Sequence, residues 1–442
     1  MQIVQQILFI LISGFAIWFF AKKIKEIRRN ILLGRDETIN DNKAQRWKNV
    51  LLLAFGQKKM FRNPMVAVLH FFVYAGFIII NIEILEIILD GILGKHRMFA
   101  ESLGNVYTFI IDGFEMLAVL VILGCAVFLI RRNIIKLRRF VSKDLDGWPR
   151  SDANYILMME IVLMLLFLSW NSTDRALQLQ GAAHYHDTGS FLVSGKIAPL
   201  LRDWSSNNLM GIERGAWWMH IMGVFFFMNY LPWSKHLHIV LAFPNAYYAR
   251  LEPKGKMENM PEIQKEVLYA MQPELAPTGE TEEHKKFGAK DVFDLSWKNL
   301  LDAYSCTECG RCSAACPATQ TGKKLSPRKI MMDTRDRAEA VGRNINKNGK
   351  FTEDEKTLLH NYITVEELRA CTTCNACVQE CPVSISPLDI IIQLRRYLVM
   401  EESNSPQEWT AMFSNVENNF APWKFSPDER DKWTEEMKNQ NQ

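Results

Sequence analysis

Two cysteine-rich runs constrain this chain more than any other feature of its sequence. They read CTECGRCSAACP at 306–317 and CTTCNACVQECP at 371–382, with the spacing C-x2-C-x2-C-x3-C followed by proline in both. Three cysteines at this spacing wrap a loop around one [4Fe–4S] cluster, and in two-cluster ferredoxins the fourth cysteine of each run binds the other cluster. The expected ligands are Cys306, Cys309, Cys312 and Cys381 for one cluster, and Cys371, Cys374, Cys377 and Cys316 for the other.

Zinc and disulfide bonds are the alternative uses of these cysteines. Structural zinc sites use C-x2-C pairs and do not need the third and fourth spacing seen here. Eight of the nine cysteines lie in the two runs, which leaves no separate set for disulfides, and disulfides require an oxidising compartment. The soluble part of the chain is therefore expected on the reducing, cytoplasmic side. The ninth, Cys125, lies in an apolar run and is expected to be a small buried packing residue.

Long apolar runs fill the first 245 residues of the chain. They lie at 4–21, 65–89, 107–130, 154–170 and 215–243. Each is long enough, or nearly so, to cross a hydrocarbon layer of about 30 Å as a helix. No cleavage-site pattern follows the first run, so we expect a retained helix and not a signal peptide. The predicted fold class is mainly α, with a five-helix transmembrane bundle followed by an α-helical dicluster ferredoxin-like domain.

The connections between these runs differ in positive charge. Lys and Arg number twelve in 22–63 and seven in 131–153, but two in 90–106 and three in 171–212. The positive-inside rule places the first two connections in the cytoplasm. The sequence therefore predicts a multi-pass protein of the cytoplasmic (inner) membrane, with its N-terminus outside and the cysteine runs on the cytoplasmic side.

The chain divides into four parts on this basis. We expect a five-span cytochrome b-like membrane domain at 1–243, a linker with one or two short helices at 244–295, a two-cluster ferredoxin-like domain at 296–400 and a polar tail at 401–442. The segment 43–56 is consistent with an amphipathic helix along the inner surface or with a simple loop. The net charge of +3 implies no polyanionic partner, so no nucleic-acid partner is expected.

Histidines inside membrane spans are costly and usually functional. His70 lies near the inner end of the second run, and His220 and His238 lie near the outer and inner ends of the fifth. On one continuous helix, the eighteen residues between His220 and His238 make five turns, so the two would share a face about 27 Å apart along the axis. His236 would fall almost opposite that face, unless Pro232 rotates the lower segment.

His70 and His238 are predicted at the same depth on two helices, which is the arrangement of a bis-histidine haem b in a bundle. The alternative is a hydrogen-bonded pair of interior histidines, and His236 would substitute if the helix turns. A partner for His220 would fall near Ile80, which cannot bind iron. His184 or His186 from the outer loop could fold in to serve a second haem; otherwise the protein holds one.

Acidic side chains gather at the expected outer ends of the spans. They are Glu83, Glu86, Asp112, Glu115 and Glu213, with Arg214 beside the last and the string HYHDTGS at 184–190 nearby. Oxidation of a quinol near this face releases protons, and carboxylates and histidines could relay them. The alternative is that these groups are interfacial and solvated.

The membrane half resembles the cytochrome b (gamma) subunit of respiratory nitrate reductase. The string PWSKHLH at 232–238 is similar to the stretch that holds that family's inner haem ligand. The resemblance implies that His238, rather than His236, is the ligand and that His70 is its partner. Ile80 stands where the family has its second ligand on the second helix.

The other half resembles the cluster-binding component of heterodisulfide reductase. The whole resembles membrane-bound iron–sulfur oxidoreductases in which a stretch like ENNFAPWKFSPDERDKW, 417–433, precedes a catalytic module with CCG motifs. This sequence contains no CCG, so the resemblance implies that a separate cytoplasmic redox subunit, of the CCG iron–sulfur type or containing flavin, carries that module.

The sequence thus predicts a quinone-linked oxidoreductase subunit without catalytic residues of its own. It would pass electrons between the membrane quinone pool and a cytoplasmic partner through haem b and two [4Fe–4S] clusters. Two alternatives remain at this point: a redox-sensing iron–sulfur membrane protein, and a plain membrane anchor for clusters without quinone chemistry.

Overall fold

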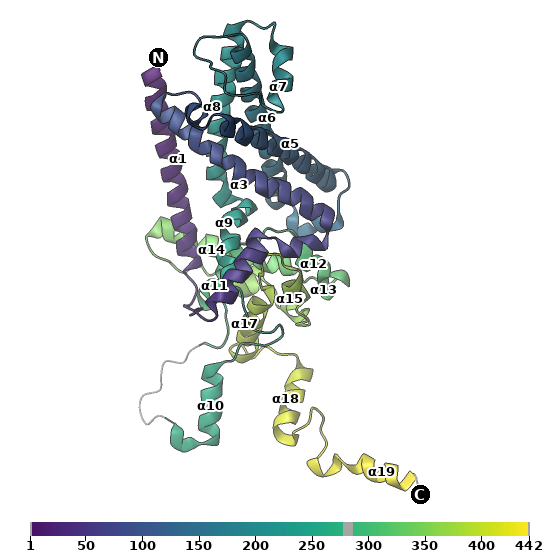
Figure 1. The fold of residues 1–442 in the computed structure, drawn as a ribbon. Coiled ribbons are helices and arrows are strands. Elements are labelled where there is room, and N and C mark those ends of the chain that lie inside the picture. Colours follow the sequence, from purple (N-terminus) through teal and green to yellow (C-terminus); the bar gives the residue numbers. More distant parts are fainter. Residues whose placement is uncertain (1, 277–285, 441–442) are drawn as a thin grey trace.

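The computed structural model describes residues 2–276 and 286–440, and these are mainly helical (Figure 1). Within the described residues the only β-type pairings are two isolated bridges, between Arg35 and Ser296 and between Leu359 and Ile363. Four helices are long and apolar enough to cross a membrane. They are α1 (Gln2–Ile31), α3 (Pro64–Leu93), α5 (Asn105–Asn133) and α6 (Trp148–Leu179). The mainly helical class and its membrane helices are confirmed.

The fifth predicted span is not one continuous helix. Helix α8 (Ser206–Tyr230) packs against α6 in the bundle, and the chain then turns through η6 (Leu231–Trp233) and η7 (Lys235–Leu237) into α9 (His238–Tyr247). Pro232 causes the break, because proline lacks an amide hydrogen and its ring clashes with the preceding turn. The prediction of a helix through 215–243 is therefore wrong, and so is the shared face of His220 and His238.

The bundle is apolar on both its inside and its outside. Its interior holds side chains such as Phe9, Ala118 and Ile221, which are almost fully buried. Apolar side chains of α1, including Ile3, Leu11 and Trp18, are exposed on the outer surface. Large exposed apolar surfaces are rare on water-soluble monomers, so this surface suits contact with lipid.

Short helices connect α1 to α3 beneath the bundle. They are α2 (Lys43–Asn49), the π-helical turn η1 (Val50–Phe55) and the 3-10 turn η2 (Lys58–Arg62). For the segment 43–56, the structure thus contains the helix and not the simple loop. Buried Arg46 donates hydrogen bonds of 3.0 Å to the carbonyl oxygens of Tyr247 and Ala249, which ties α2 to the end of α9.

The cysteine runs lie in a second helical body directly below the bundle (Figure 1). Its helices are α11 (Trp297–Tyr304), α12 (Arg311–Ala315), α13 (Pro317–Gln320), α14 (Pro327–Asn348), α15 (Val365–Arg369), α16 (Ala376–Glu380) and α17 (Pro387–Met400). Its core continues into the membrane half, because Ile27 and Ile31 of α1 and Leu237 pack in the same apolar cluster as Leu300 and Leu394. The two halves are therefore joined by a shared core.

This second body is built from two similar halves. In each half a cysteine loop leads into a five-residue helix, α12 or α16, and the next long helix begins with serine followed by proline. Ser326 caps α14 and Ser386 caps α17 through the side-chain oxygen, and proline is favoured at the first helical position. The repeat thus extends beyond the cysteine spacing to the helix that follows each loop.

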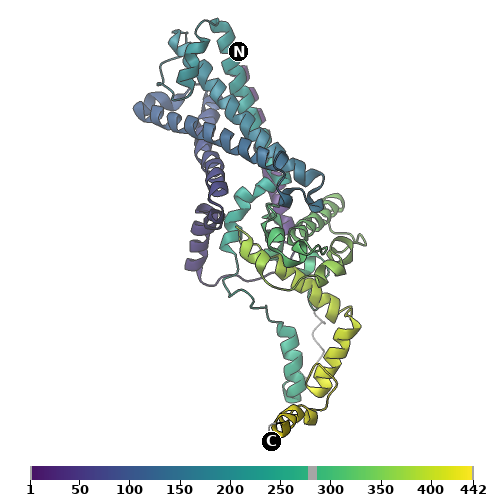
Figure 2. The same cartoon turned by 90° about the vertical axis from the view of Figure 1, so that its right-hand side faces the viewer.

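The remaining elements lie at the two ends of the molecule. At the bundle end are α4 (Met98–Leu103), α7 (Ser194–Ile197) and η5 (Ala198–Leu201). At the other end are α10 (Pro261–Met271), α18 (Gln407–Asn419) and α19 (Lys432–Gln440), which extend away from the cysteine-containing body (Figure 2). The predicted short helix within the linker is thus present as α10.

Candidate functional site

The two cysteine loops have the same unusual backbone. Glu308 and Gly310 in the first loop have φ values of 53° and 72°, and Thr373 and Asn375 occupy the equivalent left-handed positions in the second, with φ values of 55° and 62°. This conformation is rare outside glycine and asparagine and bends the chain sharply. It wraps each loop around a central point, as a cluster-binding loop requires. The donor set, eight thiols in two such loops, fits two [4Fe–4S] clusters.

The fourth cysteine of each run lies near the other run. Burial raises the pKa of the Cys377 thiol to about 12, and the neighbouring thiols of Cys371 and Cys316 add to this rise. Burial likewise raises the pKa of the Cys381 thiol to about 11, with a contribution from nearby Cys309. The fold therefore crosses the two runs, with Cys316 near the second loop and Cys381 near the first.

The two loops differ in what covers them. Cys306 in the first loop is buried, and that loop lies against the membrane half. Cys374 in the second loop is exposed, as are its neighbours Thr372 and Thr373. One loop thus faces the bundle, and the other faces solvent.

A cavity of about 370 Å³ lies between the bundle and the first loop. Three histidines line it: His70 of α3, His236 of η7 and His238 of α9. The same cavity is lined by Thr307, Glu308, Cys309 and Arg311 from the first cysteine loop, and by Pro382 and Val383 after the second. The histidine site and the first cysteine loop therefore share a wall.

The hydrogen bonds of these histidines favour metal binding. His70 donates from Nδ1 to Gln57 Oε1 at 2.9 Å, and His238 donates from Nδ1 to the carbonyl oxygen of Lys235 at 3.1 Å. Metal-binding histidines commonly donate the second ring nitrogen in this way, which leaves Nε2 for the metal. His236 Nε2 is buried and has no hydrogen-bond partner among the described residues. The prediction that His236 points away from His238 is wrong, because the turn at η7 brings both to one cavity.

Four guanidinium groups also line the histidine cavity. They belong to Arg131, Arg132, Arg139 and Arg311. Guanidinium groups bind carboxylates by charge-assisted hydrogen bonds. A haem b carries two propionate carboxylates, so an apolar cavity with histidines and arginines on its walls fits this cofactor.

His220 lies in a separate and much smaller cavity. This cavity has a volume of about 40 Å³ and is also lined by Ile80 and Glu160. His220 donates from Nδ1 to the carbonyl oxygen of Leu163 at 3.0 Å. His184 and His186 are exposed on the outer loop and do not fold in. The residues around His220 therefore do not fit a second haem.

The acidic side chains at the far end of the bundle form a buried network. Glu86, Glu115 and Glu213 are buried, so the alternative that they are solvated is wrong. At the centre lies Arg97, which is 2% exposed and forms an ion pair with buried Asp174. Sequence reasoning missed both, although Arg97 was visible as one of two cations in its connection.

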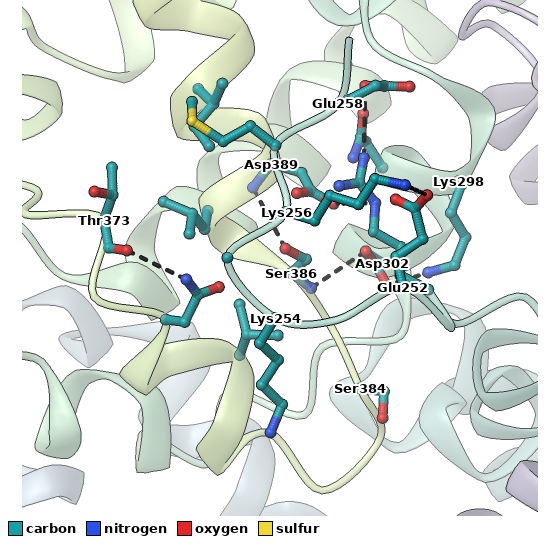
Figure 3. A pocket seen from close by; sticks show the side chains of 18 of the residues that line it. Glu252, Lys254, Lys256, Glu258, Lys298, Asp302, Thr373, Ser384, Ser386 and Asp389 are labelled. Carbon is teal, nitrogen blue, oxygen red and sulfur yellow. Dashed lines mark hydrogen bonds and ion pairs between the residues drawn. The ribbon is translucent and has the colours of Figure 1, made fainter.

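A polar pocket of about 210 Å³ lies beside the exposed second loop (Figure 3). Thr373 and Ser384 lie at its edge, and Lys298 and Asp302 form a 2.5 Å ion pair in its wall. Lys59, also in the wall, donates a hydrogen bond of 2.8 Å to the carbonyl oxygen of Cys381. The second loop is thus bordered by charged side chains that are already paired within the chain.

Comparisons with known proteins agree with the cysteine chemistry. The family profile "4Fe-4S dicluster domain" matches residues 305–385. The chain is 28% identical to "Probable iron-sulfur-binding oxidoreductase FadF" of Bacillus subtilis over 98% of this chain and 61% of that protein. It is 27% identical to "EtfAB:quinone oxidoreductase" of Syntrophomonas wolfei over 92% of this chain and 54% of that protein.

A third relative matches a shorter part of the chain. It belongs to a heterodisulfide reductase of Methanosarcina acetivorans that is named as dependent on ferredoxin or F(420)H(2), and it is 34% identical over 27% of this chain and 60% of that relative. No solved structure matches. The chain spans little more than half the length of the two long relatives. Together the findings describe an oxidoreductase-like iron–sulfur protein with membrane helices.

Proposed function

We propose that the protein is a membrane-anchored electron-transfer subunit. It exchanges electrons between the quinone pool and a redox partner on the cytoplasmic side, through one haem b and two [4Fe–4S] clusters. The observation that carries this proposal is the cavity shared by three histidines and the first cysteine loop. A haem bound there supplies one-electron redox chemistry next to a cluster.

The cluster ligands in this proposal follow the crossed arrangement of the two runs. One cluster is held by Cys306, Cys309, Cys312 and Cys381, and the other by Cys371, Cys374, Cys377 and Cys316. Backbone amides support the thiolates: Thr373 donates to Cys371 Sγ at 3.4 Å, and Ile385 donates to Cys381 Sγ at 3.3 Å. Hydrogen bonds to cluster sulfurs are one of the means by which a protein sets the reduction potential.

The haem ligands in this proposal are His70 and His238. Both have Nδ1 held by a hydrogen bond and Nε2 available. His236 is the substitute, because it lines the same cavity and its Nε2 has no partner among the described residues. The surrounding apolar walls and arginines exclude water and balance the charge of the propionates.

The exposed second loop is the proposed point of contact with the partner. The first loop is covered by the bundle, so only the loop around Cys374 is open to another protein. We infer that this partner is a cytoplasmic redox protein with iron–sulfur or flavin chemistry, since a heterodisulfide reductase component and an EtfAB:quinone oxidoreductase are among the relatives. The latter name also supports quinone as the membrane substrate. The buried acids at the opposite end are candidates to carry the protons of quinol oxidation.

An optical spectrum of the purified full chain tests the proposal. Reduction with dithionite is expected to produce the α band of a b-type haem, and a quinone analogue is expected to reoxidise it. An α band that no quinone analogue reoxidises contradicts the quinone step. Absence of the band contradicts the haem, and it leaves a protein that anchors or senses through its clusters alone.

The haem ligands are tested by His70→Ala. Loss of one axial ligand is expected to abolish or strongly reduce the α band, while the paramagnetic resonance signals of the reduced clusters persist because the cysteine loops are untouched. His220→Ala is the matched control, since His220 lies in the smaller cavity, and it is expected to keep the band. A haem that survives His70→Ala shows that the ligand assignment is wrong.

A further inference from the structure

Lys235 makes contacts in both directions between the histidine cavity and the first cysteine loop. Its carbonyl oxygen accepts the Nδ1 hydrogen bond of His238 at 3.1 Å. Its ammonium group forms a 2.6 Å ion pair with Glu308, which lies between Cys306 and Cys309 in the loop. One residue therefore connects a proposed haem ligand with a proposed cluster loop.

This ion pair is buried. The side chain of Lys235 is 11% exposed and that of Glu308 is 3% exposed. The second carboxylate oxygen of Glu308 accepts a 2.8 Å hydrogen bond from Arg335 of α14. Charges are costly to remove from water, and a buried pair is tolerated when its geometry is good and its remaining valences are satisfied. The contacts of Glu308 meet that condition.

Glu308 also holds the backbone of the loop. Its φ of 53° is a left-handed conformation that side chains other than glycine and asparagine rarely adopt. Such a conformation persists where surrounding contacts determine it. Here two cations from different parts of the chain, Lys235 before α9 and Arg335 in α14, grip the carboxylate of this residue. The position of the loop thus depends on a cation that belongs to the membrane half.

We propose that Lys235, through its ion pair with Glu308, is a positioning residue that fixes the first cluster relative to His238. This inference rests on the proposed function, because it concerns transfer between the two proposed redox sites. In that transfer one electron is lost by the group in the histidine cavity and gained by the cluster of the first loop, or the reverse; no bond is made and no proton moves. The ion pair holds the distance over which this electron passes.

The test uses the purified full chain and Lys235→Met. Methionine retains most of the side-chain length and removes the charge, and the carbonyl that accepts from His238 stays in place. The α band and the cluster resonance signals are therefore expected to remain. In stopped-flow measurements, electron exchange between haem and clusters is expected to slow by about tenfold or more, equivalent to a barrier higher by about 1.4 kcal/mol. Lys235→Arg, which restores a cation, is expected to recover the rate.

Lys256→Met is the matched control. Lys256 forms an ion pair of the same length, 2.6 Å, with Glu252, but both side chains are more than half exposed. Exposed ion pairs contribute little, so the transfer rate is expected to stay at the parental value. If Lys235→Met does not retain its clusters, Glu308→Gln removes the charge from the other side of the pair and is read in the same way.

The outcomes separate the two levels of the proposal. Parental transfer in Lys235→Met or Glu308→Gln, with the α band present, contradicts the positioning role alone. Slow transfer in the control to the same extent also contradicts it, because the effect then does not depend on the buried pair. An unsubstituted protein that lacks the α band contradicts the proposed function, and the positioning role fails with it.

Discussion

Gly310 is the single position in the first cysteine loop where the structure excludes a side chain. It has a φ of 72°, and a β-carbon there would lie 2.5 Å from Arg328 Nη1. Arg328 is 1% exposed and forms a 2.6 Å ion pair with Asp144 of the membrane half, so it cannot easily move. We expect Gly310→Ala to cost about 1–2 kcal/mol from the left-handed backbone alone. The measurable result is loss of the cluster resonance signal of the first loop.

The second loop provides the control at this scale. Asn375 occupies the position equivalent to Gly310, with a φ of 62°. Glycine adopts this conformation freely, so Asn375→Gly is expected to keep both cluster signals. Equal cluster content in Gly310→Ala and Asn375→Gly would show that the close approach of Arg328 does not constrain the loop.

Among the elements, the break between α8 and α9 decides where the histidines lie. The turns η6 and η7 carry His236 and His238 into one cavity with His70. Pro232→Ala restores an amide hydrogen and removes the ring, so α8 can extend across the turn. We expect haem content, measured as the α band relative to protein, to fall while iron bound as clusters stays unchanged.

A second proline makes a matched comparison. Pro244 lies inside α9, beyond the histidines, and the helix continues around it. Pro244→Ala is therefore expected to leave the haem content at the parental level. Parental haem content in Pro232→Ala as well would mean that the turn is held by its surroundings, such as Asp152, which accepts hydrogen bonds from Tyr230 and from the amide of Lys235, and not by the proline.

The whole molecule has two ends that are proposed to lie on opposite sides of a membrane. Ser190 is exposed on the loop at the bundle end, and Ser414 is exposed on α18 beyond the cysteine-containing body. In intact cells, a membrane-impermeant maleimide is expected to label Ser190→Cys but not Ser414→Cys, which reacts only after permeabilisation. The unsubstituted chain gives the background. Labelling of Ser414→Cys in intact cells would reverse the proposed orientation.

Much of this architecture could be predicted from the sequence, because it depends on local patterns. Apolar runs define α1, α3, α5 and α6, and the cysteine spacing defines both loops. The break at Pro232 could not be placed, since proline is tolerated in some membrane helices and packing decides the outcome. The Lys235–Glu308 contact joins residues 73 positions apart, and no periodicity relates them. Arg97 and its buried acids were hidden for the same reason.

The shared core of the two halves limits how this protein can work. A ferredoxin on a flexible tether delivers electrons by diffusing from donor to acceptor. Here Ile27 and Ile31 of the first membrane helix are packed among the core residues of the cysteine-containing body, and Asn30 donates a buried 3.1 Å hydrogen bond to Tyr304 Oη of α11. Such a body cannot swing without opening its own core. Any acceptor must come to the exposed loop, so turnover depends on how fast that second protein arrives and leaves.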